Sequence, residues 1–146
     1  KKYNAGLFLM HKRGTPKDMQ KKLNPRTNMV KEFDKFIEKR LKILDKMKFN
    51  LKKVWFDPGI GFGKTLYQNL QLMRSLSKYS HKNLQILLGS SRKSWINFID
   101  PSDADQRIGG SLASITHALQ QNVNTFRIHD VQETNQMIKV LKALNK

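Results

Sequence analysis

The chemically most informative segment of the sequence is residues 57–65, DPGIGFGKT, which follows a short apolar run. Its glycines at alternate positions free the backbone for close approach to a ligand, and its GKT end is similar to a phosphate-binding loop. That loop needs a glycine where Pro58 stands, however, and the spacing also fails the dinucleotide fingerprint. Asp57 lies at the end of a predicted buried strand and needs a partner there. Its carboxylate could accept paired N–H bonds from a planar heterocycle.

Basic residues follow two further apolar runs and could bind an anion. Residues 90–94, SSRKS, combine small hydroxyl residues, which are typical of a helix cap, with two cations beside a helix amino end. An exposed basic cap without a ligand is the alternative for this segment. Arg127 and His129 lie two positions apart on a predicted strand, so they point the same way and together suit a phosphate or a carboxylate. His11 is expected to be a loop histidine whose hydrogen bonds are satisfied within the protein.

Each of these polar clusters follows a predicted strand. Short apolar runs predict strands at residues 6–10, 54–56, 86–88 and 125–129. Apolar residues at helical spacing predict helices at residues 30–47 with Asn28 as cap, 66–76, 94–98 and 111–120, and a last helix opened by a capping box at 130–133 and ending near 144. Strands alternating with helices indicate a parallel sheet joined by right-handed crossovers. Because ligands bind at the carboxyl ends of such strands, we expect Asp57, Lys93, Arg127 and His129 to converge there.

Length and composition narrow the classes of protein that fit. With 146 residues the chain suits one domain with a modest core. The lack of cysteine excludes disulfides, thiolate metal sites and a thiol nucleophile. The sequence contains no apolar run of about 18 residues, the length that a membrane span needs. The amino end shows no signal-peptide pattern, so the expected location is the cytoplasm.

The chain is strongly basic, with 28 Lys and Arg residues against 11 Asp and Glu residues and a formal charge of +17. Such a charge promotes loose association with polyanions. The basic residues are scattered along the chain without consecutive blocks or interleaved aromatic residues, which favours solvated helix faces over a specific nucleic-acid site. Non-catalytic binding of a polyanion stays an alternative, and a steep salt dependence of nucleic-acid affinity would support it.

Taken in order, the motifs resemble those of dihydropteroate synthase. They are MH at 10–11 with the following G-x-P and MQ, DPGIGFGK at 57–64, SRKS at 91–94, GSLA at 110–113 and RIHDV at 127–131. The resemblance extends over essentially the whole chain. It implies an α/β fold of parallel βα units from a (β/α)8 TIM barrel. The implied activity condenses p-aminobenzoate with 6-hydroxymethyl-7,8-dihydropterin diphosphate to 7,8-dihydropteroate and diphosphate, a step of folate biosynthesis and a sulfonamide target.

The resemblance also implies roles for individual residues. Asp57 would hydrogen-bond the pterin ring and Lys93 would contact it, while Ser94 would receive the carboxylate of p-aminobenzoate. Arg127 would stack on the pterin and, with His129, hold the diphosphate. Catalysis by Lys93, Arg127 and His129 would rest on positioning and charge stabilisation, because the diphosphate leaves before the amine attacks. The other residues of the pterin pocket would be Met10, Phe62 and Gly89.

The length of the chain limits what the resemblance implies. A TIM barrel needs about 250 residues, and this chain resembles only the last four βα units. We therefore expect one pterin-binding-type domain, residues 1–146, that is the carboxyl-terminal portion of a barrel, from a truncated gene product or a longer enzyme. The resemblance implies Mg²⁺ only as an ion bound by the diphosphate and by residues that are absent from this chain. Expected partners are the two substrates, the amino-terminal half and, in the full-length enzyme, a second copy. A pterin- or folate-binding domain serving methyl transfer is the alternative.

Overall fold

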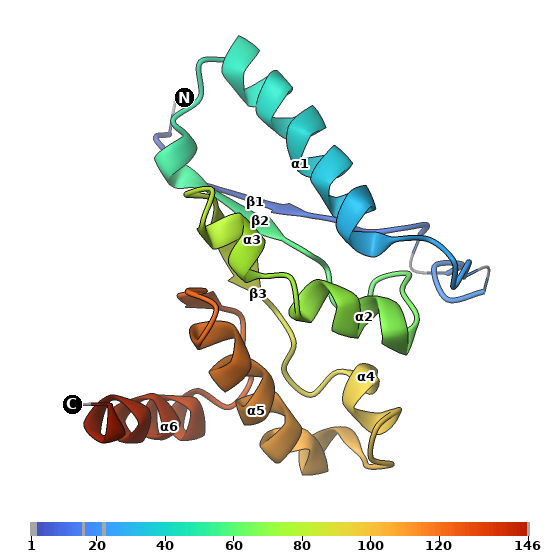
Figure 1. Ribbon diagram of the computed structural model, residues 1–146, viewed down its shortest axis with the longest axis vertical. Helices are drawn as coiled ribbons and strands as arrows, with labels where there is room; N and C mark the ends of the chain where they lie inside the picture. The colour runs from blue at the N-terminus through green and yellow to red at the C-terminus, as the bar shows by residue number, and fades with distance from the viewer. Residues whose placement is uncertain (1–2, 16, 22, 146) are drawn as a thin grey trace.

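The sheet consists of parallel strands, as the alternation of elements predicted. A computed structural model describes residues 3–15, 17–21 and 23–145. Within these residues, β1 (Leu7–Met10), β2 (Val54–Asp57), β3 (Gln85–Leu88) and β4 (Thr125–Phe126) form a four-stranded sheet in the order β1-β2-β3-β4 (Figure 1). Every neighbouring pair is parallel. The carboxyl ends of all the strands therefore lie at one edge of the sheet.

Helices connect the strands and give the crossovers expected of βα units. They are α1 (Met29–Lys46), α2 (Leu66–Met73), α3 (Ser77–Ser80), α4 (Ser94–Asn97), α5 (Ile108–Leu119) and α6 (Val131–Leu144), with 3-10 turns η1 (Leu51–Lys53) and η2 (Ala104–Arg107). The side chain of Asn28 accepts a hydrogen bond from the backbone N–H of Lys31, which confirms the predicted cap of α1. In the described part of the chain, no helix is both long and apolar enough to cross a membrane.

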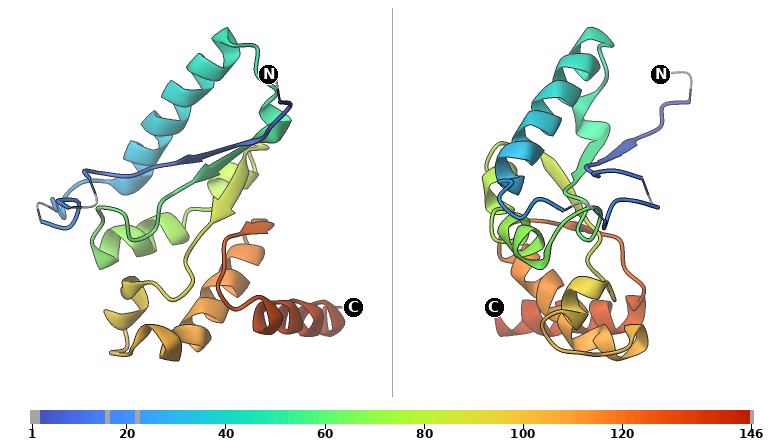
Figure 2. Two further views of the ribbon diagram at one scale, coloured as in Figure 1. Left: turned by 180° about the vertical axis from the view of Figure 1, so that it is seen from behind. Right: turned by 90° about the vertical axis from the view of Figure 1, so that its right-hand side faces the viewer.

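The two faces of the sheet differ in what covers them. Strand residues such as Val54, Phe56 and Leu88 point toward the helices and belong to the buried apolar core, which also contains Phe33 of α1. Figure 2 shows α1 and α2 to one side of β1 in its right-hand view. On the other face, Phe8 is 62% exposed and its ring lies 5.2 Å from that of Trp55. One face of the sheet thus carries apolar side chains that the described residues leave open to solvent.

The structure departs from the predicted elements near the site. The predicted strand at 125–129 ends at Phe126, because the last ladder bond runs from the N–H of Arg127 to the carbonyl of Leu88 and β3 ends there. The helix predicted at 66–76 ends at Met73 and α3 follows separately. The predicted capping box at 130–133 is wrong: Asp130 occupies the N-cap position of α6, but its carboxylate binds a distant arginine instead of the helix backbone.

Candidate functional site

The loop after β2 lies directly against the loop after β1, and its glycines make this contact possible. A Cβ atom at Gly59 would lie 1.9 Å from the carbonyl oxygen of His11, and one at Gly63 would lie 2.5 Å from that of Arg13. Both glycines also have a positive φ, which other residues rarely adopt. Gly59 and Gly63 therefore allow one protein loop to approach another, whereas the sequence alone suggested that they allow approach to a ligand.

Lys64 joins these two loops. Its side chain is buried, and its ammonium donates hydrogen bonds to the carbonyl oxygens of His11 at 3.2 Å, Gly59 at 2.9 Å and Phe62 at 3.0 Å. Burial lowers the pKa of Lys64 to about 7, with Asp57 opposing the shift. The sequence did not predict this role of Lys64, since a single sequence does not distinguish an ammonium that binds carbonyls from one that binds phosphate.

Asp57 lies at the carboxyl end of β2, opposite Met10 of β1 in the strand register. It is 5% exposed, and its Oδ1 accepts the backbone N–H of Gly59 at 2.7 Å. Burial raises its pKa, while the Gly59 hydrogen bond and the charges of Lys93 and Arg127 oppose that shift. Among the described residues, the second carboxyl oxygen makes no hydrogen bond, so it can accept one from a ligand.

Lys93 reaches from the loop after β3 to the loop after β2. Its Nζ donates to the carbonyl oxygen of Ile60 at 2.6 Å and lies 4.7 Å from the centre of the Phe62 ring. Burial lowers the pKa of Lys93 to about 8; Asp57 opposes this shift and Arg127 adds to it. Lys93 is therefore near enough to Asp57 and Arg127 for their charges to act on its pKa, as its position after a strand predicted.

Arg127 and His129 follow β4 but have different surroundings. The guanidinium of Arg127 lies over Gly89, since a Cβ there would be 3.3 Å from its Nε. The Nδ1 atom of His129 instead lies 3.1 Å from the hydroxyl of Ser91. The structure thus brings Asp57, Lys93 and Arg127 into one electrostatic cluster, whereas the side chain of His129 contacts Ser91.

Ser94 lines a pocket that does not include Asp57, Lys93 or Arg127. It is the first residue of α4 and lines a pocket of about 600 Å³, together with Gln20, Gly61 and Phe98 among others. The side-chain amide of Gln20 donates to the carbonyl of Gly61 at 2.6 Å, which holds the loop after β1 against one wall of this pocket. Among the described residues the Ser94 hydroxyl has no hydrogen-bond partner, so it is available to a ligand in the pocket.

Residues 90–94 do not form the helix cap that their composition predicted. The N-cap of α4 is Lys93, without a side-chain capping bond. The hydroxyl of Ser90 instead bonds that of Ser114, and Arg92 binds Asp130. These polar groups therefore contact distant elements and do not cap α4.

His11 also differs from its prediction. It is buried, with its ring packed edge-on against Phe33 and Phe36. Its Nδ1 atom has no hydrogen-bond partner among the described residues, so the expectation of a satisfied histidine is wrong. Burial lowers its pKa to about 4, which keeps the ring neutral near pH 7. The aromatic surroundings explain both observations, because they exclude polar partners.

The charges of the site favour an anionic ligand. One carboxyl, Asp57, lies within electrostatic reach of three cations, Lys64, Lys93 and Arg127. An anion bound here would reduce this excess of positive charge. No group of three or more His, Cys, Asp or Glu side chains that could hold a metal ion occurs in the described ranges. These residues therefore do not fit a metal centre by themselves.

Comparison with known proteins places this arrangement in a family. Residues 1–129 match the family described as pterin binding enzyme. The chain is 35% identical over 146 residues to the bifunctional dihydropteroate synthase/dihydropteroate reductase of Helicobacter pylori, covering all of this chain and 38% of that protein. It is 35% identical over 136 residues to the dihydropteroate synthase of Escherichia coli K12, covering 92% of this chain and 48% of that protein. The chain thus spans about half the length, or less, of these relatives.

Solved structures give the same result. A dihydropteroate synthase of Yersinia pestis in complex with a sulfonamide drug matches with a TM-score of 0.90 and 32% identity, over 99% of this chain and 52% of that one. A dihydropteroate synthase of Thermus thermophilus in complex with 4-aminobenzoate matches with a TM-score of 0.87 and 30% identity, over 99% and 59%. The predicted resemblance and the partial-barrel fold are confirmed. With its residues matched from the first strand to the end of the fourth βα loop, the chain belongs to the family of pterin binding enzymes.

Proposed function

We propose that this chain is the carboxyl-terminal half of a dihydropteroate synthase barrel and forms one pterin-binding domain with a complementary half. The reaction joins p-aminobenzoate to 6-hydroxymethyl-7,8-dihydropterin diphosphate and releases diphosphate. The observation that carries this proposal is the cluster of Asp57, Lys93 and Arg127 at the carboxyl ends of neighbouring parallel strands. A buried carboxyl beside two cations suits a substrate that combines a heterocycle bearing N–H groups with an anion.

Asp57 would bind the pterin ring. The support is its depth in the site and the carboxyl oxygen that Gly59 leaves unused. Met10, Phe62 and Gly89 would line the pocket around the ring. The absence of a side chain at Gly89 lets the guanidinium of Arg127 approach the strand end closely, and the pterin ring would stack on the planar guanidinium.

Arg127, His129 and Lys93 would act on the diphosphate and the reacting methylene. The bond between the methylene carbon and the diphosphate oxygen breaks, and the leaving oxygen keeps the electron pair. The amine nitrogen of p-aminobenzoate then forms the new carbon–nitrogen bond and releases one proton to water. Cations fixed where the negative charge develops stabilise this step, and no side chain needs to act as a nucleophile.

Ser94 would receive the carboxylate of p-aminobenzoate. The support is its hydroxyl, which is free among the described residues, and its position on a pocket of about 600 Å³. The pocket and the charged cluster share a boundary, because Ser94 follows Lys93 directly and Gly61 lies in the loop that Lys93 contacts. A Thermus thermophilus relative binds 4-aminobenzoate.

A complementary half-barrel would complete the site. β1 and β4 each have one neighbouring strand in the described sheet, and the face that carries Phe8 and Trp55 is partly open. Exposed strand edges and apolar side chains of this kind pair with further strands. Mg²⁺ ligands would come from that other half, and no step proposed for this chain passes through the metal. A second copy would join in the full-length enzyme.

Reconstitution tests the proposal. The chain is expressed with and without a separately encoded amino-terminal half of a family member, and dihydropteroate formation is followed. We expect no turnover from the chain alone and turnover from the mixture, which Arg127→Ala abolishes and the surface variant Lys35→Met leaves unchanged. Full activity of the chain alone would contradict the half-barrel argument. A mixture that associates and binds the pterin but never consumes p-aminobenzoate would favour a methyl-transfer domain.

A further inference from the structure

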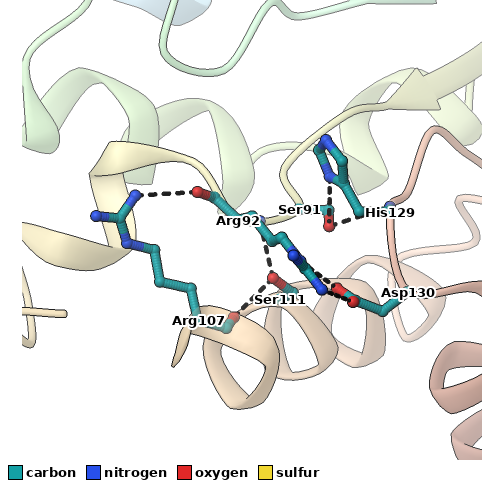
Figure 3. A network of polar contacts seen from close by, with 6 residues as sticks. All are labelled: Ser91, Arg92, Arg107, Ser111, His129 and Asp130. Atoms are coloured by element: carbon teal, nitrogen blue, oxygen red, sulfur yellow. Dashed lines mark hydrogen bonds and ion pairs between the residues drawn. The ribbon is translucent and has the colours of Figure 1, made fainter. Parts of the chain in front are cut away.

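A network of polar contacts joins the loops after β3 and β4 (Figure 3). It includes the residues directly before Lys93 and directly after His129 in the chain, and the proposed reaction uses none of its bonds. Its members are Ser91, Arg92, Arg107, Ser111, His129 and Asp130.

The centre of the network is the ion pair between Arg92 and Asp130. Nε of Arg92 donates to one carboxyl oxygen at 3.0 Å, and Nη2 donates to the other. The Asp130 side chain is 6% exposed, and the hydrogen bonds from Arg92 lower its pKa. Two parallel bonds between a guanidinium and a carboxylate fix orientation as well as distance. Since Arg92 precedes Lys93 and Asp130 follows His129, this pair sets the spacing of the two loops that carry the cations.

The backbone of Arg92 is held separately by α5. Its φ is +57°, a left-handed conformation that is unfavourable for a residue with a side chain. Its N–H donates to the hydroxyl of Ser111 at 2.9 Å, and its carbonyl accepts from Nη1 of Arg107 at 3.0 Å. These bonds stabilise the turn that sends the Arg92 side chain toward Asp130 and the Lys93 side chain toward the loop after β2.

Ser91 holds the ring of His129. Its hydroxyl oxygen accepts the backbone N–H of His129 at 3.4 Å and lies 3.1 Å from Nδ1 of the ring. In Figure 3 the other ring nitrogen points away from Ser91. A hydroxyl that accepts the backbone N–H can donate its own proton to Nδ1. The neutral ring then carries its proton on Nε2 and presents it as a donor.

We propose that Ser91, Arg92 and Asp130 are positioning residues for the diphosphate subsite. The ion pair holds the two loops in register, and Ser91 keeps the neutral ring of His129 in the Nε2–H form, so that His129 and Arg127 donate to the same anion. This inference rests on the proposed function for the identity of the anion. The orientation of the ring and the state of the ion pair belong to the free protein and are tested without any ligand.

The first experiment reads the His129 ring directly. Long-range ¹H–¹⁵N NMR spectra of the ligand-free chain, recorded at a pH where the ring is neutral, distinguish the two tautomers. We expect the Nε2–H form in the wild type, a mixture in Ser91→Ala, and recovery of the Nε2–H form in Ser91→Thr, which restores a hydroxyl. An Nδ1–H ring in the wild type, or identical spectra for the wild type and Ser91→Ala, would overturn the role of Ser91.

The second experiment uses the chain combined with the complementary half-barrel and compares two ligands by calorimetry: 6-hydroxymethyl-7,8-dihydropterin diphosphate and the same dihydropterin without the diphosphate. We expect Arg92→Met and Asp130→Asn to weaken binding of the diphosphate at least about tenfold, as loss of charge-assisted contacts should, and binding of the alcohol less than about twofold. Arg92→Lys should recover part of the loss. Lys35→Met removes the same charge from the exposed surface and serves as the control.

The outcomes distinguish failure of the positioning proposal from failure of the proposed function. If the Arg92 and Asp130 variants bind both ligands more weakly by the same factor, these residues have a general structural role and the positioning proposal is overturned. If the wild-type chain combined with the complementary half-barrel binds neither ligand, the proposed function fails, while the NMR spectra of the free chain still decide whether Ser91 orients the ring. If the ion-pair variants do not fold, as thermal melting would show, the Ser91→Ala and Ser91→Thr pair measures the diphosphate-specific loss by the same calorimetry.

Discussion

Replacing Lys64 with methionine should change how the free energy of unfolding depends on pH. Methionine keeps an unbranched side chain of similar length but removes the ammonium that donates to the carbonyls of His11, Gly59 and Phe62. In the folded protein, burial lowers the pKa of Lys64 from 10.5 to about 7. An unfolded chain exposes the same group to water, where its ordinary pKa applies.

The sign and size of the effect follow from these two pKa values. Between them, the unfolded state binds more protons than the folded state, so the free energy of unfolding rises with pH. One pKa unit corresponds to about 1.4 kcal/mol. From pH 6 to pH 10 the wild type should therefore gain about 4 kcal/mol relative to Lys64→Met. This is an upper value, because the three carbonyl acceptors favour the ammonium and oppose the desolvation.

Urea denaturation at pH 6, 8 and 10 measures this difference. The slope of each transition also shows whether both proteins expose the same surface on unfolding. Lys35→Met is the matched control, since it makes the same substitution at a side chain that is 74% exposed and forms one surface ion pair. We expect the control to differ from the wild type by less than about 1 kcal/mol at each pH.

If the difference in free energy of unfolding between Lys64→Met and the wild type stays constant within about 1 kcal/mol from pH 6 to pH 10, this prediction is wrong. That result would mean that the ammonium keeps its ordinary pKa in the folded protein. The three carbonyl oxygens would then compensate fully for the loss of water, and Lys64 would be a permanent cation of the site.

Three further predictions concern a loop contact, a helix cap and the anion subsite. Gly59→Ala should lower the free energy of unfolding by several kcal/mol, because its Cβ would collide with the carbonyl of His11. The control Gly109→Ala, whose Cβ meets open space on α5, should raise the free energy of unfolding by about 0.5–1 kcal/mol. Equal effects of the two substitutions in urea denaturation would contradict the loop contact. Asn28→Ala should lower thermal stability by about 1 kcal/mol through loss of the cap of α1, and an unchanged melting temperature would exclude that contribution. Arg127→Ala should weaken binding of the pterin diphosphate by about 1.5–3 kcal/mol in calorimetry, and an unchanged affinity would remove this residue from the anion subsite.

Much of the fold was predictable because its signals are local. Strands buried between helices and a barrel interior need continuous apolar runs, and three of the four predicted strands agree with β1, β2 and β3 within one residue at each end. The cap at Asn28 was also local, since donor and acceptor lie three residues apart. The convergence of Asp57, Lys93 and Arg127 followed from their common position after parallel strands.

The directions of neighbouring side chains were decided only by the tertiary structure. Lys64 and the carbonyl of His11 are 53 residues apart, and Arg92 and Asp130 are 38 apart. The sequence presents Arg92 and Lys93 as one basic pair, yet a turn held by α5 sends one side chain to the carboxylate of Asp130 and the other to the loop after β2. A cation binds whichever acceptor the fold places within reach, and that acceptor belongs to a distant loop. Residue types and spacing therefore determined which groups gather at the strand ends, whereas contacts between loops decided which of them face a ligand and which hold the site together.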